Sequence, residues 1–327
     1  MMMFEADAHI LITGGTGFFG TALLRHLQSL GEEAPLVTVL SRDPDRFSNK
    51  YSDLARLVKW VRGDVFVPNS LPLGGQYSHI LHGATDSTLG PKMSPLDRYS
   101  QIVEGTRNIL EYAVLSGAKR FLLTSSGGVY GPQPHNMKFI LEDYNSMPDP
   151  LEANHSYSVA KRCAEHLCSL YRDLHGIDTV VARCFAFAGR DLPLDAHFAI
   201  GNFVRDALKG PEIYVAGDGT PIRSYMDQRD LSRWLFTLLS CGDAGQAYNV
   251  GSDIPITIAE LAKKVRDIIS PSKPVLIAQS SSDNNFRNRY VPSISKAHNR
   301  HGLSMTYTLE EAIKSMASPS LIHGTET

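Results

Sequence analysis

The chain has 327 residues, of which 43% are hydrophobic and 20% are charged, and its formal net charge is −2 at pH 7. This balance fits a globular protein of one large or two modest domains and lacks the basic excess of a nucleic-acid-binding surface. No apolar run reaches the roughly 18 residues of a membrane span, and the first residues do not resemble a signal peptide. We therefore expect a cytoplasmic protein that binds neither nucleic acid nor membranes.

The four cysteines lack the spacing of a zinc site or of a disulfide framework. They are Cys163, Cys168, Cys184 and Cys241, with no CxxC pair and no histidine cluster. In a chain of this length such cysteines are typical of reduced thiols in the core. The sequence therefore predicts no metal site.

The first 30 residues predict a strand, a glycine-rich turn and a helix. Residues 9–13 are a short apolar run, and residues 18–30 carry apolar side chains at helical spacing. In such a turn Gly14 permits the tight bend, Gly17 lets the backbone approach a pyrophosphate, and Gly20 lets helix and strand pack closely. The helix N-terminus then offers N–H groups to the phosphates. This pattern favours a dinucleotide site; an ordinary strand-to-helix turn is the alternative.

The residues after the second predicted strand indicate the cofactor. That strand covers residues 36–40 and is followed by Ser41 and Arg42. An acidic residue at this point binds the adenosine ribose of NAD, whereas a guanidinium suits the additional phosphate of NADP. We therefore expect NADP(H) as the preferred cofactor and NAD(H) as a possible one. The alternative is that Asp43 binds the ribose and Arg42 is a solvated loop charge.

The rest of the first half alternates between strands and helices. Strands are predicted over residues 58–61, 80–81, 120–124 and 178–182, and helices over residues 99–116 and 155–174. This alternation predicts an α/β fold with a parallel, doubly wound sheet of the Rossmann type.

The second half predicts a smaller mixed α/β lobe. Helices are expected over residues 199–208, 231–239, 257–269 and 310–316, and short strands over residues 213–215 and 248–250. Thr257, with Glu260 three residues later, is the expected N-cap of one helix. We predict a dinucleotide-binding domain over residues 1–185, to which residues 224–253 return, and a substrate lobe over residues 186–223 and 254–327.

Residues that follow the strands are expected to face a ligand at the carboxyl edge of the sheet. Asp64 follows the third strand and can accept a hydrogen bond from an adenine amino group, with a turn role as its alternative. Small residues at positions 83–85 leave room for a cofactor. Farther along, Tyr157 and Lys161 are four residues apart, so one helix face carries both.

Taken together, six motifs resemble the extended short-chain dehydrogenase/reductase family. They are TGGTGFFG at 13–20, GD at 63–64, TSSGGVYG at 124–131, YSVAK at 157–161, RCFAFAG at 183–189 and GDGTPIRSYMDQRD at 217–230. The resemblance covers nearly the whole chain. It implies an NAD(P)-dependent enzyme acting on a nucleotide-linked sugar, a catalytic set of Ser126, Tyr157 and Lys161, and a homodimer formed through helices 99–116 and 155–174. The alternative for these three residues is a capping serine, an amphipathic tyrosine and a surface lysine.

The motif pattern and the family resemblance together predict which residues bind the cofactor and the substrate. For the cofactor they are Gly14, Thr16, Gly17, Phe18, Phe19, Gly20, Ser41, Arg42, Asp64, Val65, Gly83, Ala84, Thr85, Thr124, Ser125, Tyr157, Lys161 and Cys184. For the substrate they are Ser126, Gly127, Tyr157, Ala186, His197, Phe198, Tyr214, Arg223 and Arg287. Arg223 is expected at the diphosphate because a fork of donors matches phosphate oxygens.

Departures from the family pattern narrow the expected reaction. The family's 4,6-dehydratases carry an Asp-Glu pair where this chain has Gly127 and Gly128, so dehydration is disfavoured. Asparagine is usual where Ile102 and Ala186 stand here. We expect NADPH-dependent reduction of a nucleotide-linked 4-keto-6-deoxy sugar, with Tyr157 as proton donor. An NAD-retaining 4-epimerase is the alternative, and a non-catalytic dinucleotide sensor is a third hypothesis.

Within that mechanism each residue of the catalytic set has a separate task. A free phenol has a pKa near 10, and we expect the Lys161 ammonium on the same helix face to lower the pKa of Tyr157. Ser126 is expected to hydrogen-bond the carbonyl oxygen.

Overall fold

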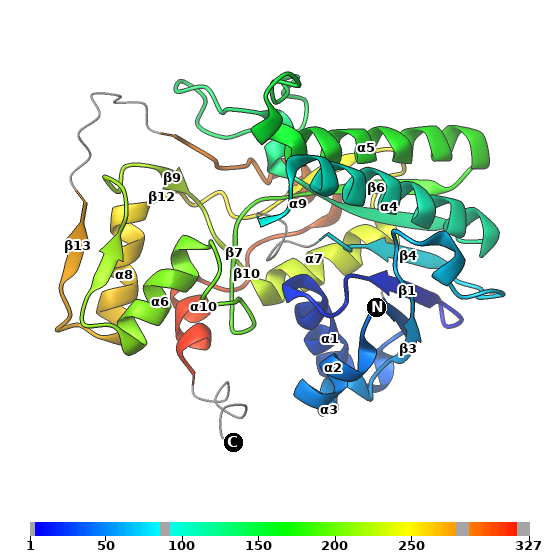
Figure 1. The fold of residues 1–327 in the computed structure, drawn as a ribbon, viewed down its shortest axis with the longest axis horizontal. Coiled ribbons are helices and arrows are strands. Elements are labelled where there is room, and N and C mark those ends of the chain that lie inside the picture. The colour runs from blue at the N-terminus through cyan, green and yellow to red at the C-terminus, as the bar shows by residue number, and fades with distance from the viewer. Residues whose placement is uncertain (1–3, 86–91, 279–287, 319–327) are drawn as a thin grey trace.

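A seven-stranded parallel sheet forms the centre of a computed structural model that describes residues 4–85, 92–278 and 288–318 (Figure 1). The strand order is β11-β6-β5-β4-β1-β2-β3. The bounds are β1 (His9–Thr13), β2 (Leu36–Ser41), β3 (Lys59–Arg62), β4 (His79–His82), β5 (Arg120–Ser126), β6 (Asp178–Cys184) and β11 (Ala247–Val250). The predicted doubly wound sheet is confirmed.

The direction in which the sheet grows reverses between β1 and β4. The chain builds β2 and β3 toward one edge, then returns to β4 and builds β5, β6 and β11 toward the other. Ligands of such sheets bind outside the carboxyl ends of the strands at this reversal. The residues after β1 and β4 therefore border the place where a ligand is expected.

Helices cover both faces of the sheet, and each face has its own hydrophobic core (Figure 1). Ile10 and Ile12 of β1 are buried with α1 (Phe18–Leu30) and α7 (Gln228–Cys241). Leu11, which points to the other face, is buried with α4 (Pro95–Leu115) and α5 (Ser156–His175). This alternation is the two-residue period of a strand that is covered on both sides.

Short elements connect these layers, and one of the long helices, α4, begins earlier than predicted. They are α2 (Pro44–Lys50), α3 (Ser52–Ala55), α9 (Ser295–His301), and the 3₁₀ turns at Gly31–Glu33, Pro68–Ser70, Gly127–Tyr130 and Ala153–His155. The helix predicted from residue 99 begins at Pro95, because the Ser94 side chain accepts the N–H of Asp97 and forms its N-cap.

The smaller lobe consists of three helices around a core of their own. Its helices are α6 (Ala199–Lys209), α8 (Ile258–Ile269) and α10 (Leu309–Ala317). Its strand pairs are β8 (Ile213–Val215) with β13 (Val275–Ile277), β7 (Phe187–Ala188) with β10 (Met226–Asp227), and β9 (Ile222–Arg223) with β12 (Ile256–Thr257). The predicted cap at Thr257 is present, with Glu260 completing a capping box. The division into two domains stays a prediction.

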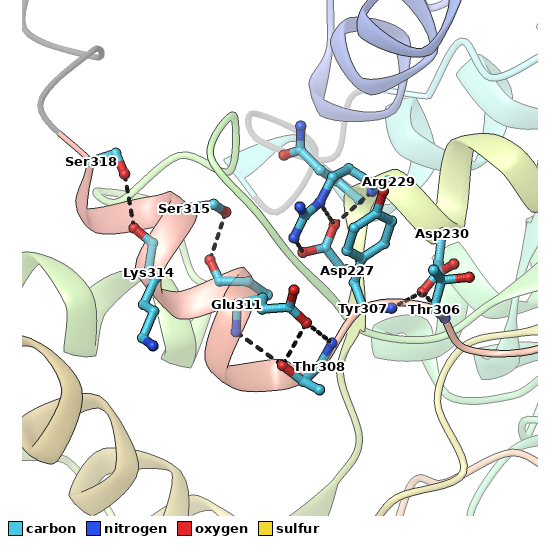
Figure 2. A network of polar contacts seen from close by, with 12 residues as sticks. Asp227, Arg229, Asp230, Thr306, Tyr307, Thr308, Glu311, Lys314, Ser315 and Ser318 are labelled. Atoms are coloured by element: carbon cyan, nitrogen blue, oxygen red, sulfur yellow. Dashed lines mark hydrogen bonds and ion pairs between the residues drawn. The ribbon is translucent and has the colours of Figure 1, made fainter. Parts of the chain in front are cut away.

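A buried carboxylate ties the C-terminal segment to α7 (Figure 2). Asp230 is fully buried and accepts the backbone N–H groups of Thr306 and Tyr307 at 2.8 and 2.9 Å, and the Arg233 guanidinium at 2.6 Å. Nearby, the Arg229 guanidinium lies 3.6 Å over the Tyr307 ring. The carboxylate that closes the 217–230 motif therefore orders the chain before α10.

In the described part of the chain, none of the helices combines the length and the apolar character that crossing a membrane requires. All four cysteines are free thiols.

Candidate active site

The turn after β1 brings the backbone of three segments into close contact. Gly14 has a φ of +76°, and a Cβ there would lie 2.5 Å from the carbonyl carbon and oxygen of Gly83. A Cβ on Gly20 would lie 2.2 Å from the Cα of Gly15. Around Gly17, by contrast, a Cβ would meet only the Gly14 oxygen, at 3.5 Å. The turn therefore packs tightly on its inner side and leaves open space at Gly17, where α1 begins. Both properties suit a bound pyrophosphate.

Gly14→Ala is expected to lower the free energy of unfolding by about 2 kcal/mol and to abolish dinucleotide binding. The side chain adds the cost of a left-handed backbone to a collision with the Gly83 carbonyl. Gly117→Ala is the matched control, since Gly117 has a φ of +73° and no atom within 4 Å of its added Cβ. Denaturant titrations compare the two variants, and equal losses would show that packing against Gly83 is unimportant.

The loop after β2 contains one carboxylate, and that carboxylate is already engaged. The Asp43 side chain accepts the N–H of Arg46 at 3.2 Å and so caps α2. Asp43 in turn donates its own N–H to the Ser41 hydroxyl at 3.1 Å. The Arg42 side chain is exposed, and its carbonyl accepts a hydrogen bond from Arg62 at 3.0 Å. The cap hydrogen bond engages one oxygen of Asp43, and the choice between the NADP and the NAD alternatives stays a prediction.

Other predicted cofactor residues lie at the carboxyl edge as expected. The Asp64 carboxylate accepts the N–H of Phe66 at 2.9 Å, which is the contact of an Asx turn, and Val65 lies against Gly105 of α4. Ala84 donates its N–H to the Thr13 hydroxyl at 3.2 Å. Thr16 is exposed, whereas Phe18 and Phe19 are half-buried, which places the polar residue of this turn outward.

Lys161 connects the ends of two central strands. Its ammonium donates hydrogen bonds of 2.8 Å to the hydroxyl of Thr85, after β4, and to the carbonyl of Thr124, in β5. The side chain is only 3% exposed, and this burial lowers the pKa of Lys161 to about 8. Because Thr85 is two residues from Gly83, the glycine-rich turn and the lysine belong to one continuous site.

The Tyr157 phenol lies one helical turn before Lys161 and beside Ser126. Burial raises the pKa of Tyr157, while the Ser126 hydroxyl and the positive charge of Arg98 oppose that rise. The Arg98 guanidinium lies 4.2 Å over the Tyr157 ring. The expected lowering of the pKa of Tyr157 by Lys161 is wrong, because burial outweighs the opposing groups and the positive charge that acts on this phenol is that of Arg98. Sequence reasoning missed Arg98. No sequence signal links α4 to α5 at this point; their packing brings Arg98 here.

Tyr290 is a second phenol at the site that sequence reasoning missed. Its ring lies 4.5 Å from the ring of Phe185, and its hydroxyl donates to the Cys184 carbonyl at 3.5 Å. A Cβ on Gly127 would lie 2.5 Å from the Tyr290 oxygen. The neighbouring Arg287, a predicted substrate residue, lies outside the described residues.

Among the other predicted substrate residues, Arg223 lies beside Tyr290 and His197 lies near Arg98. Arg223 donates to the carbonyls of Ile222 and Asn288, each at 2.9 Å, and its guanidinium lies 5.9 Å over the Tyr290 ring. Burial and the charge of Arg98 lower the pKa of His197, whose ring packs 4.2 Å from that of Phe198.

Of the remaining predicted residues, Ala186 and Ser125 lie near the ends of β5 and β6, whereas Tyr214 lies in the smaller lobe. The Ala186 carbonyl accepts the N–H of Met226 at 3.0 Å, next to the strand that ends at Cys184. The Ser125 hydroxyl donates to Glu165 at 2.6 Å, so it supports α5. Tyr214, 51% exposed, lies on β8 beside β13, at the end of the molecule away from β1 (Figure 1). The structure thus separates Tyr214 from Tyr157.

This arrangement suits hydride transfer that is coupled to proton transfer at an oxygen. Ser126 and Tyr157 provide two hydroxyl groups at the carboxyl end of β5, and a buried ammonium lies behind them. The helix N-terminus of α1 and the open side of Gly17 provide the place for phosphates. Among the described residues, no group of three or more His, Cys, Asp or Glu side chains could hold a metal ion.

Comparison with known proteins is consistent with this geometry. Residues 10–251 match the model of the NAD dependent epimerase/dehydratase family. UDP-glucuronic acid decarboxylase 6 from Arabidopsis thaliana is 30% identical over 96% of this chain and 89% of its own length.

Solved structures of other proteins share the fold over nearly the whole chain. A UDP-glucose 4-epimerase from Thermotoga maritima, solved with UDP-glucose, aligns with a TM-score of 0.79 at 22% identity, covering 94% of this chain and 97% of that one. RMD from Pseudomonas aeruginosa, solved with NADPH, aligns with a TM-score of 0.76 at 24% identity, covering 95% and 98%.

Proposed function

The chain belongs to the NAD dependent epimerase/dehydratase family of extended short-chain dehydrogenases/reductases, and on that premise we propose that it reduces a nucleotide-linked 4-keto-6-deoxy sugar with NADPH. It is an NAD(P)-dependent enzyme. The finer proposal concerns the cofactor, the direction of hydride transfer and the substrate. Each of these rests on residues at the carboxyl edge of the sheet.

The loop after β2 carries the proposal of NADPH. Its carboxylate, Asp43, caps α2, and the Arg42 guanidinium follows β2 directly. The Arg62 guanidinium, at the end of the neighbouring β3, pairs with Asp45 of α2 at 2.6 Å. A ribose phosphate is favoured by such permanent charges and would be repelled by a free carboxylate. Because a cofactor that carries this phosphate is normally consumed in net reductions, we propose reduction as the overall reaction.

Within the proposed reaction the protein's residues orient the sugar and deliver a proton. A nicotinamide dinucleotide bound along the Gly14–Gly20 turn would supply the hydride. Tyr157 protonates the C4 oxygen as its charge develops, and Ser126 donates a hydrogen bond to the same oxygen. Lys161, bound to Thr85 and Thr124, keeps a positive charge beneath these groups.

The environment of Gly127 supports reduction over elimination of water. Elimination requires an acid and a base, which the family's 4,6-dehydratases carry at the positions of Gly127 and Gly128. Here a Cβ at position 127 would meet Tyr290 at 2.5 Å and Phe185 at 2.7 Å. Aromatic side chains thus already fill the space that such an acid would need.

The decisive assay mixes the purified protein with NADPH and a panel of nucleoside-diphosphate 4-keto-6-deoxyhexoses. We expect NADPH absorbance to fall with one of them, and we expect Arg42→Asp to raise the KM for NADPH by about 10- to 100-fold with little effect on NADH. Arg300→Asp on α9 is a charge-matched control. Absence of NADPH consumption would refute the reductase proposal.

A redox-neutral reaction is the second candidate, because the 30% identical relative is named a UDP-glucuronic acid decarboxylase. Such an enzyme, like an NAD-retaining 4-epimerase, would return its hydride in each turnover. Purified protein would then contain bound NAD, and it would release CO₂ from UDP-glucuronic acid or invert C4 of a UDP-hexose without added cofactor. The predicted homodimer and cytoplasmic location stay predictions.

A further inference from the structure

The backbone around Tyr290 is held from both sides. Tyr290 donates its N–H to the Ile222 carbonyl at 3.0 Å, and Ile222 donates to the Asn288 carbonyl at 2.9 Å. The next residue, Val291, donates its N–H to the Gln133 side chain at 2.9 Å. These contacts attach the segment to β9 on one side and to the loop after β5 on the other. The position of the Tyr290 side chain is therefore determined by its backbone.

The Tyr290 side chain occupies the space beside the reacting groups. Its ring packs on Phe185, and its oxygen lies where a side chain at position 127 would project. The Ser126 hydroxyl neighbours both phenols and acts to lower the pKa of Tyr157 and of Tyr290. Two phenols and one serine hydroxyl therefore converge at the end of β5.

The surroundings keep Tyr290 protonated. Burial raises the pKa of Tyr290, and the neighbouring Tyr157 and Cys184 raise it further, whereas Ser126 and the charge of Arg223 act in the opposite direction. A protonated phenol donates a hydrogen bond and keeps its proton throughout the neutral range. The Tyr290 hydroxyl donates to the Cys184 carbonyl at 3.5 Å, a long contact that a better acceptor would replace.

We propose that Tyr290 is a further catalytic residue that donates a hydrogen bond to the C4 oxygen of a 4-keto sugar, opposite Tyr157. The inference rests on the proposed function. In the reaction the C4–H bond forms from the hydride, the Tyr157 O–H bond breaks, and its proton joins the C4 oxygen. Tyr290 loses no proton; it stabilises the negative charge that develops on that oxygen. Its hydroxyl, together with the Phe185 ring, also occupies the space that an acidic side chain at position 127 would need.

Tyr290→Phe tests the hydrogen bond because it removes one oxygen and leaves the ring on Phe185. We expect kcat for the 4-keto sugar to fall by about 10- to 100-fold, with an unchanged NADPH dissociation constant and an unchanged melting temperature. Tyr144→Phe is the matched control, since Tyr144 is half-buried and stacks on Tyr130, outside the site. A kcat within twofold of the native value for Tyr290→Phe would overturn the proposal.

Two further measurements distinguish a failure of the Tyr290 proposal from a failure of the reductase proposal. If the native protein inverts C4 with bound NAD, the reductase proposal fails, and the same variant is then measured for epimerisation, in which the same oxygen gains charge. If it shows no turnover, calorimetry compares binding of a thymidine-diphosphate 4-keto-6-deoxyhexose and of thymidine diphosphate. Weaker binding of the keto sugar alone by Tyr290→Phe supports the proposal, and unchanged or equally weakened binding of both contradicts it.

Discussion

Tyr157→Phe is expected to lower kcat for the keto sugar by about 10³-fold while NADPH binds as tightly as before. The variant loses the O–H that protonates the C4 oxygen, and general acid catalysis of this kind contributes about 10²- to 10⁴-fold. The ring keeps its place under the Arg98 guanidinium, 4.2 Å away. The melting temperature should therefore change little. Stopped-flow absorbance measures turnover, and fluorescence titration measures NADPH binding.

A second tyrosine on the same helix provides the control for this experiment. Tyr171 of α5 donates its hydroxyl to Glu111 at 3.3 Å, away from Ser126, so Tyr171→Phe should keep native turnover. Because Phe at position 157 retains the aromatic packing, a loss of activity reports the oxygen itself. Substantial activity in Tyr157→Phe would show that another group supplies the proton and would remove the central assumption of the mechanism.

Lys161→Met is expected to abolish turnover. Relative to the native protein, the variant is also expected to become less stable as the pH rises. In the native protein the pKa of Lys161 is lowered from 10.5 to about 8, mainly by burial. This drop corresponds to about 3 kcal/mol against keeping the charge in the folded state. Methionine fills a similar volume without a charge. At pH 7 the variant therefore avoids this cost, although it also loses the hydrogen bonds to Thr85 and Thr124.

The sign of the pH effect follows from proton binding. Between pH 8 and 10.5 the unfolded chain holds a proton on Lys161 that the folded chain has released, so the native protein gains stability as the pH rises. Below pH 8 Lys161 is protonated in both the folded and the unfolded chain, and the free-energy cost of its buried charge is fully present. The free energy of unfolding of Lys161→Met minus that of the native protein should thus fall by about 2 kcal/mol between pH 7 and 9.5.

Denaturant titrations at a series of pH values measure this difference. Lys263→Met, an exposed position on α8, controls for removal of a lysine without burial. The groups that act on the Lys161 charge are Cys184, Glu165, Arg98 and Cys168, and they are present in both proteins. A difference that is constant over this pH range would mean that Lys161 keeps an ordinary pKa in the folded state.

Local sequence patterns were sufficient to predict the central sheet of this protein and the helices that flank it. The strand, turn and helix at residues 9–30, and the helix face shared by Tyr157 and Lys161, depend on residues within about one turn of each other. A left-handed Gly14 and the capping box at Thr257 are likewise local, and the structure contains both. The alternation of such elements was enough to predict a parallel sheet, because few topologies accommodate it.

The side chains that contact those residues from distant parts of the chain depended on tertiary structure. Arg98 reaches Tyr157 because α4 packs on α5, and Tyr290 reaches Gly127 because residues 288–292 run between two other segments. Contacts between segments far apart in the chain depend on packing and leave no periodic signal in it. The sequence by itself thus determined the sheet and the helix face that Tyr157 and Lys161 share, while only the tertiary structure decided which charges and hydroxyls surround these two side chains.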